Sequence, residues 1–309
     1  MNEADAVLEA EARVVVSRLH TRFRGALVGL AVGEALAAPA VLGRPGAFAP
    51  VRDLIGGGPH DLPRGAWGDD TAMTLCVARS LLATGRCNPD DHLHRYRLWQ
   101  RDGDGSATGE CIGIGAGTTR ALVDGRPDAA VPDGAESLAR VVPLAMRHWA
   151  DGRALRDAVH AATAVTCHDP ATFDAAARCA DMLRAALRGA PPEAILAAGD
   201  LTVDGFAAIS MAAPSTPVPS TPVPSTPADV LAAAARASTA GDGWKDAVLR
   251  AVNHGGPADS LGAVTGALIG AHLGVEAIPT AWRASVARRE EIEELADRLL
   301  AEALMGLVP

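Results

Sequence analysis

The sequence predicts an all-α fold, in which many helices pack orthogonally into one compact domain over residues 1–309. Aromatic residues are only 3% of the chain although hydrophobic residues are 49%, so Ala and Gly must fill much of the core. This composition suits closely packed helices, because sheets are enriched in β-branched and aromatic side chains. Glycines recur at spacings of four, a helical period, and no segment alternates apolar and polar residues as a strand does.

The expected helices, roughly a dozen, follow from apolar periodicity and its interruptions. Residues 6–23 predict a charged, exposed helix, and residues 24–36 an apolar one that ends before Pro39. Residues 40–66 and 102–117 are rich in Gly and predict loops. Asp169 and Pro170 begin a helix as a capping carboxylate and a first-turn proline. Other helices are expected at 71–84, 91–101, 118–123, 138–150, 154–166, 243–253, 261–273 and 287–304, and from Asp229.

Residues 214–227 form a Pro/Ser/Thr-rich repeat that reads PSTPVPSTPVPSTP. Proline at this density prevents helix formation and predicts an extended or disordered segment. We interpret it as a surface loop inserted into the single domain, because two acidic clusters that we expect to meet lie on either side of it. A longer surface loop adds little to the entropy of closing the chain.

Charge and composition exclude several classes of partner. The net charge is −9 and no basic run is present, which argues against nucleic acid. The five cysteines form no CxxC pair and indicate reduced thiols. No uninterrupted apolar run is long enough to predict a membrane span, and the acidic start is unlike a signal peptide. We therefore expect a cytoplasmic protein.

Two short acidic clusters are the main functional signal. Asp69, Asp70 and Thr71 form one, and Asp259 and Ser260 form the other; each precedes an apolar, Ala-rich helix. Adjacent carboxylates beside a buried helix are costly unless positive charge neutralises them, and Mg²⁺ or Mn²⁺ does so with such oxygen ligands. Either cluster alone could be a helix cap. Together they favour one shared metal site.

Two glycine series predict the pair of helices that would bring these clusters together. One consists of Gly25, Gly29 and Gly33, and the other of Gly262, Gly266, Gly270 and Gly274. A glycine inside a helix costs about 1 kcal/mol relative to alanine, a cost that close backbone approach explains. The alternative, a pair of membrane helices, is disfavoured because the stretches are short and interrupted by charge.

Five segments resemble, in order, motifs of the ADP-ribosylglycohydrolase family, which includes dinitrogenase reductase-activating glycohydrolase. Together they span nearly the whole chain. The segments are 24–36 (against RGxLxGxAxGDALG), 68–73 (against TDDTxM), 114–122 (against DIGxTTxxAL), 137–144 (against GxxMRVAPL) and 251–260 (against AVNxGGDxD[TS]).

The resemblance implies a helical fold with a pair of Mg²⁺ or Mn²⁺ ions. The implied reaction is hydrolysis of the glycosidic bond at the anomeric carbon of ribose. Its substrate would be an ADP-ribosyl conjugate, including one on a modified protein, or a smaller ribosylated compound. Asp69 and Asp70 are the implied catalytic residues. The candidate metal ligands are Asp69, Asp70, Thr71, Asp259 and Ser260, and the candidate substrate-binding residues are Trp67, Gly115, Thr118, Arg140, His254, Gly255 and Gly256.

Several positions depart from the family pattern, among them Ala135 and Glu136, around which the Asn-Gly of a family GNG loop is replaced. Gly68 and Pro257 each stand where the family has a metal-binding side chain, so we expect one ion rather than two. Val41 and Gly113 stand at or near positions where the family has acidic residues. These losses leave open a second reading, in which the chain is catalytically impaired and binds a ligand or a protein partner. A purely structural helical protein is a third.

Other candidate residues carry competing interpretations. Glu34, in place of a family Asp, would either cap a neighbouring loop or support a metal ligand, and we include it among the catalytic candidates. Glu110 is a candidate replacement general base, although a solvated side chain is equally expected in its Gly-rich loop. Trp67 would either wall the pocket or pack in the core. His254 would line the cleft or serve the turn that follows it.

Overall fold

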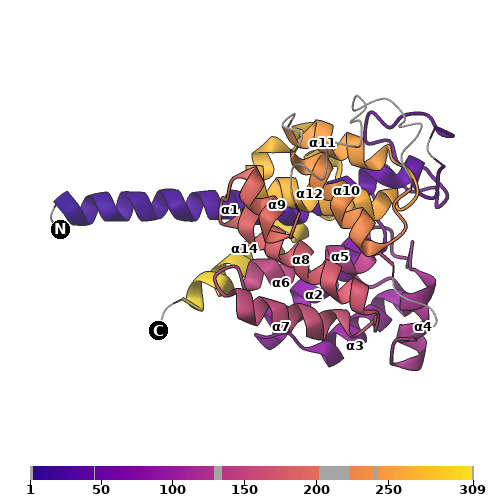
Figure 1. Ribbon diagram of the computed structural model, residues 1–309, viewed down its shortest axis with the longest axis horizontal. Helices are drawn as coiled ribbons and strands as arrows, with labels where there is room; N and C mark the ends of the chain where they lie inside the picture. The colour runs from indigo at the N-terminus through magenta and orange to yellow at the C-terminus, as the bar shows by residue number, and fades with distance from the viewer. Residues whose placement is uncertain (1–2, 45, 129–133, 202–222, 240–242, 308–309) are drawn as a thin grey trace.

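The computed structural model describes residues 3–44, 46–128, 134–201, 223–239 and 243–307, and in these residues the fold is all-α (Figure 1). No strand occurs among them; the only extended pairing is an isolated bridge between Gly57 and Leu62. The all-α prediction is confirmed. The helices are α1 (Glu3–Ala37), α2 (Asp69–Thr84), α3 (Pro89–Asp102), α4 (Ala116–Asp124), α5 (Glu136–Arg140), α6 (Val142–Arg147), α7 (Gly152–Thr163), α8 (Pro170–Leu187), α9 (Pro192–Ala198), α10 (Pro227–Thr239), α11 (Gly243–Val252), α12 (Ala258–Leu273), α13 (Thr280–Ser285) and α14 (Arg289–Met305).

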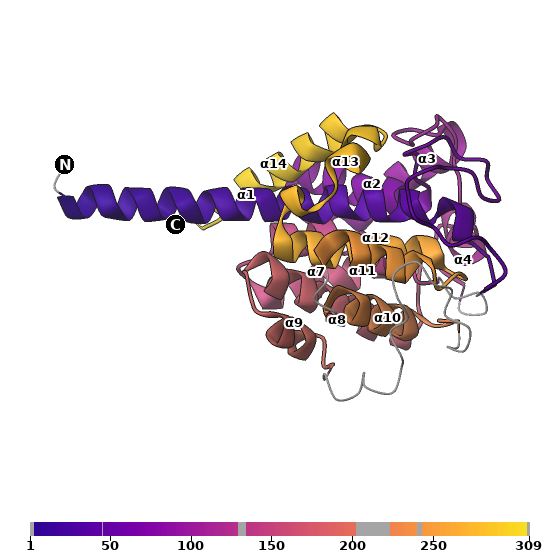
Figure 2. The ribbon, with the colours of Figure 1, turned by 90° about the horizontal axis from the view of Figure 1, so that it is seen from above.

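Helix α1 is a single helix of 35 residues, so the expected division at residues 23 and 24 is wrong. Its first half projects from the body of the molecule, and its second half runs through the core (Figures 1 and 2). No proline or capping residue interrupts the junction, and the helix simply passes from solvent into the core. By length and composition residues 11–40 could span a membrane, but 89% of the most apolar window is buried inside the protein, as in a core helix.

Helices α1 and α12 pack at backbone contact along the two glycine series. A Cβ built on Gly29 would lie 2.3 Å from the carbonyl oxygen of Gly266, and one on Gly33 would lie 2.1 Å from that of Gly262. The predicted glycine interface is therefore confirmed. Gly274 differs from the rest of its series, because it follows the end of α12 with a φ of 89°.

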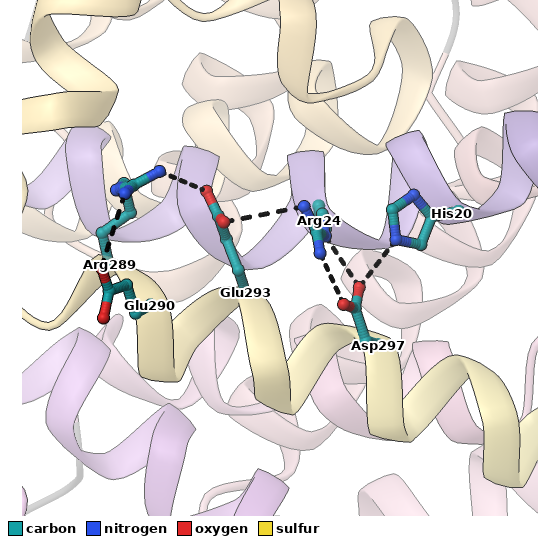
Figure 3. A network of polar contacts seen from close by, with 6 residues as sticks. All are labelled: His20, Arg24, Arg289, Glu290, Glu293 and Asp297. Atoms are coloured by element: carbon teal, nitrogen blue, oxygen red, sulfur yellow. Dashed lines mark hydrogen bonds and ion pairs between the residues drawn. The ribbon is translucent and has the colours of Figure 1, made fainter.

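Helix α14 covers the opposite side of α1, so that α1 lies between α12 and α14 (Figure 2). Arg24 of α1 donates two hydrogen bonds to Asp297 of α14, at 2.8 and 2.6 Å, and lies 3.6 Å from Glu293 (Figure 3). His20 lies 3.0 Å from Asp297. These partly exposed pairs fix the register of the two helices and contribute about 0–1 kcal/mol each.

Prolines explain most of the remaining differences from the expected helices. The predicted helix 138–150 is divided into α5 and α6, because Pro143 has no N–H to continue the first helix. Helices α9 and α13 are short, begin beside prolines and were not expected. The expected cap at Asp169 is confirmed: its carboxylate accepts a hydrogen bond from the Thr172 N–H at 3.0 Å.

The end of the Pro/Ser/Thr-rich repeat is ordered. Residues 214–222 lie outside the described part of the chain, but Pro224 is buried and Pro227 already belongs to α10. Thr226 and Asp229 cap this helix reciprocally, since each accepts a hydrogen bond from the other's N–H. Residues 223–226 have no regular secondary structure, as expected of a loop, and only Pro227 differs from the expectation.

Candidate functional site

The N-terminus of α2 is held by a carboxylate from α1. Gly68 is the N-cap residue and has no side chain to offer. Glu34 replaces it: the carboxylate accepts hydrogen bonds from the N–H groups of Gly68 (2.9 Å), Asp70 (3.2 Å) and Thr71 (2.8 Å), and from the Thr71 hydroxyl. Burial raises the pKa of Glu34 to about 7 although these hydrogen bonds oppose the shift. Of the two interpretations of Glu34, the capping contacts are the ones observed.

Asp69 and Asp70 are buried in the first turn of α2, with 3% and 0% of their surface exposed. The Ser260 hydroxyl donates to Asp70 Oδ2 at 3.0 Å, whereas Asp69 Oδ2 and Asp70 Oδ1 have no hydrogen-bond partner among the described residues. Burial, and then neighbouring carboxylates, raise the pKa of both side chains well above the usual range. Two buried carboxylates with unpartnered oxygens form a site that favours positive charge.

The second acidic cluster meets the first. Ser260 bridges α12 to α2 through its bond to Asp70, and Asp259 contributes to the raised pKa of Asp69, Asp70 and Glu34. Burial also raises the pKa of Asp259 itself. Nevertheless, within the described residues no three His, Cys, Asp or Glu side chains are gathered closely enough to hold one ion. The oxygen donors fit a hard divalent cation in chemical type, and the ligand set stays a prediction.

A cavity of about 460 Å³ opens beside these carboxylates. Asp259 and Ser260 form part of its wall, and Asp69 lies just behind the wall at Gly113: a Cβ on Gly113 would be 2.5 Å from Asp69 Oδ1. The other lining residues among those described are Val41, Leu42, His60, Gly115, Gly134, Ala135, Glu136, Pro224, Ser225, Thr226, Val230, Gly256 and Pro257.

The predicted glycines take different places at this cavity. Gly115 and Gly256 line it, and Gly255 lies behind. Gly256 donates its N–H to Gly43 at 2.8 Å and accepts from Leu42 at 2.9 Å, which ties the two loops together. Gly255 has a φ of 72°, and a Cβ there would lie 2.4 Å from the Gly43 oxygen, so only glycine fits.

Arg140 and Thr118 are buried and are not among the residues that line the cavity. Arg140 donates to the hydroxyls of Thr166 (2.8 Å) and Thr118 (3.2 Å), and its guanidinium lies 5.9 Å from the centre of the Tyr96 ring. These contacts connect α5 with α4, with α3 and with the segment after α7. The contacts observed are structural, and the charge of Arg140 also opposes the rise in the pKa of Asp69.

Four other candidates lie away from the cavity wall or are engaged elsewhere. Trp67 is buried and donates its indole N–H to the Ala287 oxygen at 3.0 Å, as expected for core packing. Glu110 is exposed, and neither it nor His254 is among the lining residues. The Thr71 hydroxyl is engaged by Glu34. A base at Glu110 and a metal bond from Thr71 therefore gain no support.

Three features of the wall were missed by sequence reasoning: Glu136, His60 and the segment 224–226. Glu136 lies next to the matched segment 137–144 and replaces part of a family loop, and this substitution could have identified it as a candidate site residue. His60 is exposed in a Gly/Pro-rich turn, where no local pattern marks it. The segment 224–226 was missed because it belongs to the Pro/Ser/Thr-rich repeat, which we interpreted as a surface loop.

Comparison with known proteins matches this architecture. The ADP-ribosylglycohydrolase family model covers residues 16–306. ADP-ribosylarginine hydrolase Tri1 of Pseudomonas putida (strain GB-1) is 31% identical over 91% of this chain and 78% of its own length. ADP-ribosyl-[dinitrogen reductase] glycohydrolase of Rhodospirillum rubrum is 28% identical over 92% and 97%. A solved structure described as an ADP-ribosylglycohydrolase-related protein complex superposes with a TM-score of 0.78 and 36% identity, over 93% of this chain and 99% of the other. The chain therefore belongs to the ADP-ribosylglycohydrolase family.

Proposed function

We propose that this protein is a metal-dependent hydrolase of the glycosidic bond at the anomeric carbon of ribose in an ADP-ribosyl conjugate. The observation that carries the proposal is the pair of buried carboxylates, Asp69 and Asp70, beside a cavity of about 460 Å³. In the part of the chain that the structure describes, Asp69 Oδ2 and Asp70 Oδ1 accept no hydrogen bond. Neutral replacements would be more stable in such a place, so the carboxylates indicate a function that needs negative charge.

Asp69, Asp70 and Asp259 would hold one Mg²⁺ or Mn²⁺ ion, with Ser260 beside them, once the three carboxylates move closer together than they lie in this structure. When bound, the ion would supply positive charge that orients the ribose hydroxyls and stabilises charge in the transition state. Glu34 holds the first turn of α2 in place and so positions Asp70. The Ser260 hydroxyl fixes one oxygen of Asp70 and leaves the other available.

Charge on the cavity wall favours a cationic leaving group. Glu136 and Asp259 line the cavity, and the described lining residues include no Arg or Lys. A guanidinium group would be attracted to such a wall. The names of two relatives from Pseudomonas putida and Serratia proteamaculans, both ADP-ribosylarginine hydrolases, agree with this chemistry. We therefore propose ADP-ribosylarginine, free or within a protein, as the substrate.

The test measures release of ADP-ribose from ADP-ribosylarginine by chromatography. The reaction is run with Mg²⁺, with Mn²⁺ and with EDTA. We expect release that needs the divalent ion and falls by about 100-fold or more in D70N, as for loss of a group that organises the transition state. Failure of the wild-type protein to release ADP-ribose from the free or protein-bound substrate would refute the proposal. Calorimetric binding of ADP-ribose without turnover would then favour the ligand-binding alternative.

A further inference from the structure

The cavity lacks the acidic side chains that the family pattern leads one to expect. Val41 and Gly113 both line the wall, and neither can accept a proton from water. Hydrolysis at an anomeric carbon benefits from a carboxylate that takes a proton from the attacking water and gives one to the leaving group. The reaction proposed above therefore requires such a group elsewhere on the same wall.

Glu136 occupies a place on the wall made by two glycines. Its carboxylate lies between Gly115 and Gly134: a Cβ on Gly115 would be 2.7 Å from Oε1, and one on Gly134 would be 2.5 Å from Oε2. Both glycines line the same cavity. Any side chain at either position would displace the carboxylate, so the two glycines make room for it.

Glu136 also lies close enough to the buried pair to interact with it. After burial, its charge is the largest contribution to the raised pKa of Asp69. The carboxylate is therefore beside the place where we expect the ribose, and it comes from α5 rather than from α2 or α12. The residue as a whole is partly exposed, while its Oε2 is buried.

The other acidic residues near the site are less suited to proton transfer. Glu34 accepts four hydrogen bonds at the start of α2, and Glu110 is exposed away from the cavity. Asp259 is a candidate metal ligand, and its Oδ1 accepts from the Ser260 N–H at 2.9 Å. Of the two carboxylates that line the described wall, Glu136 is the one without a proposed metal role.

We infer that Glu136 is the general base of this chain, replacing the carboxylates absent at Val41 and Gly113; the inference rests on the proposed function. The Glu136 carboxylate takes a proton from water as the water oxygen bonds to the anomeric carbon. The bond from that carbon to the guanidine nitrogen breaks, and its electron pair stays on nitrogen. Glu136 then returns the proton to the departing guanidine. The products are ADP-ribose and arginine, and no oxidant or reductant is needed.

The test compares wild-type protein with E136Q and with E193Q as a matched control. Glu193 lies, like Glu136, in the first turn of a short helix, but it is exposed on α9 and remote from the cavity lining. Turnover of ADP-ribosylarginine is measured together with calorimetric binding of ADP-ribose. We expect kcat of E136Q to fall by about 100-fold to 10,000-fold, the usual contribution of acid–base catalysis. We expect its affinity for ADP-ribose to stay within about threefold of wild type, and E193Q to match wild type in both measurements.

The outcomes separate this inference from the proposed function. An inactive wild-type protein refutes the proposed function itself. An active wild type with E136Q at similar kcat leaves the proposed function intact and overturns the role of Glu136. Loss of ADP-ribose binding together with kcat also overturns it, because the carboxylate would then be structural. If E136Q does not fold, E136D serves instead: it keeps the charge but withdraws it by one methylene, and kcat should still fall by about 10-fold or more.

Discussion

The backbone contact between α1 and α12 gives a prediction that can be worked from distances. In Gly29→Ala, the new Cβ would lie 2.3 Å from the Gly266 oxygen and 3.2 Å from Nε1 of Trp244. The Trp244 indole N–H donates to that same oxygen at 3.1 Å, so both obstacles are held in place. Gly29 and the Gly266 oxygen both belong to helix backbones, so neither can move without its helix.

The magnitude follows from the separation required. Real Cβ atoms essentially never approach other heavy atoms within 3.0 Å, so α1 and α12 must move apart by about 0.7 Å or more at this point. Overpacking of this kind costs about 1–3 kcal/mol, and we take the upper end because rigid backbone is involved. Alanine returns about 1 kcal/mol of helix propensity. We therefore expect a net loss of about 2 kcal/mol in the free energy of unfolding, or a melting temperature lower by about 3 °C for a chain of 309 residues.

The assay is urea unfolding monitored by circular dichroism, with Gly152→Ala as the control. At Gly152, in the first turn of α7, the nearest obstacle is the flexible Arg184 guanidinium at 3.3 Å, so we expect a change within about 0.5 kcal/mol. The double variant G29A/G266A should lose less than the sum of the single losses, since one separation of the helices accommodates both methyl groups. Single variants as stable as wild type, or strictly additive losses, would refute the reasoning.

The remaining predictions concern the site. Glu34→Gln should lower the free energy of unfolding by about 1–3 kcal/mol, because the amide can present its NH₂ group to backbone donors of α2; urea unfolding measures the loss, and an unchanged midpoint would contradict it. Millimolar Mn²⁺ should raise the melting temperature of the wild type but not of D70N, since the ion offsets repulsion among buried carboxylates. Calorimetry should find one ion per chain, and P257D should bind Mn²⁺ more tightly; two tightly held ions in the wild type would show the ligand count to be wrong. His60→Ala should raise KM for ADP-ribosylarginine but not for ribosylarginine, which lacks the phosphates; equal changes for both would exclude a phosphate contact at His60.

Local sequence features determined much of the fold. The composition and periodicity predicted the helices, because a residue's neighbours at three and four positions decide helix formation and amphipathicity. The spacing of Gly25, Gly29 and Gly33 predicted a close helix interface, since only close approach explains repeated glycine within a helix. The two acidic clusters also identified the segments that meet at the site, and their motifs identified the family.

The tertiary structure decided which groups serve the site, because those contacts join residues that are distant in the chain. The sequence left two roles open for Glu34, capping or support of a metal ligand, and the observed contact depends on the position of a helix that begins 34 residues or so later in the chain. In the cavity wall, the carboxylate of Glu136 on α5 lies between Gly115 and Gly134. The end of the repeat and the N-terminus of α12 line the same cavity. Side-chain convergence of this kind depends on how helices cross, which local periodicity does not specify.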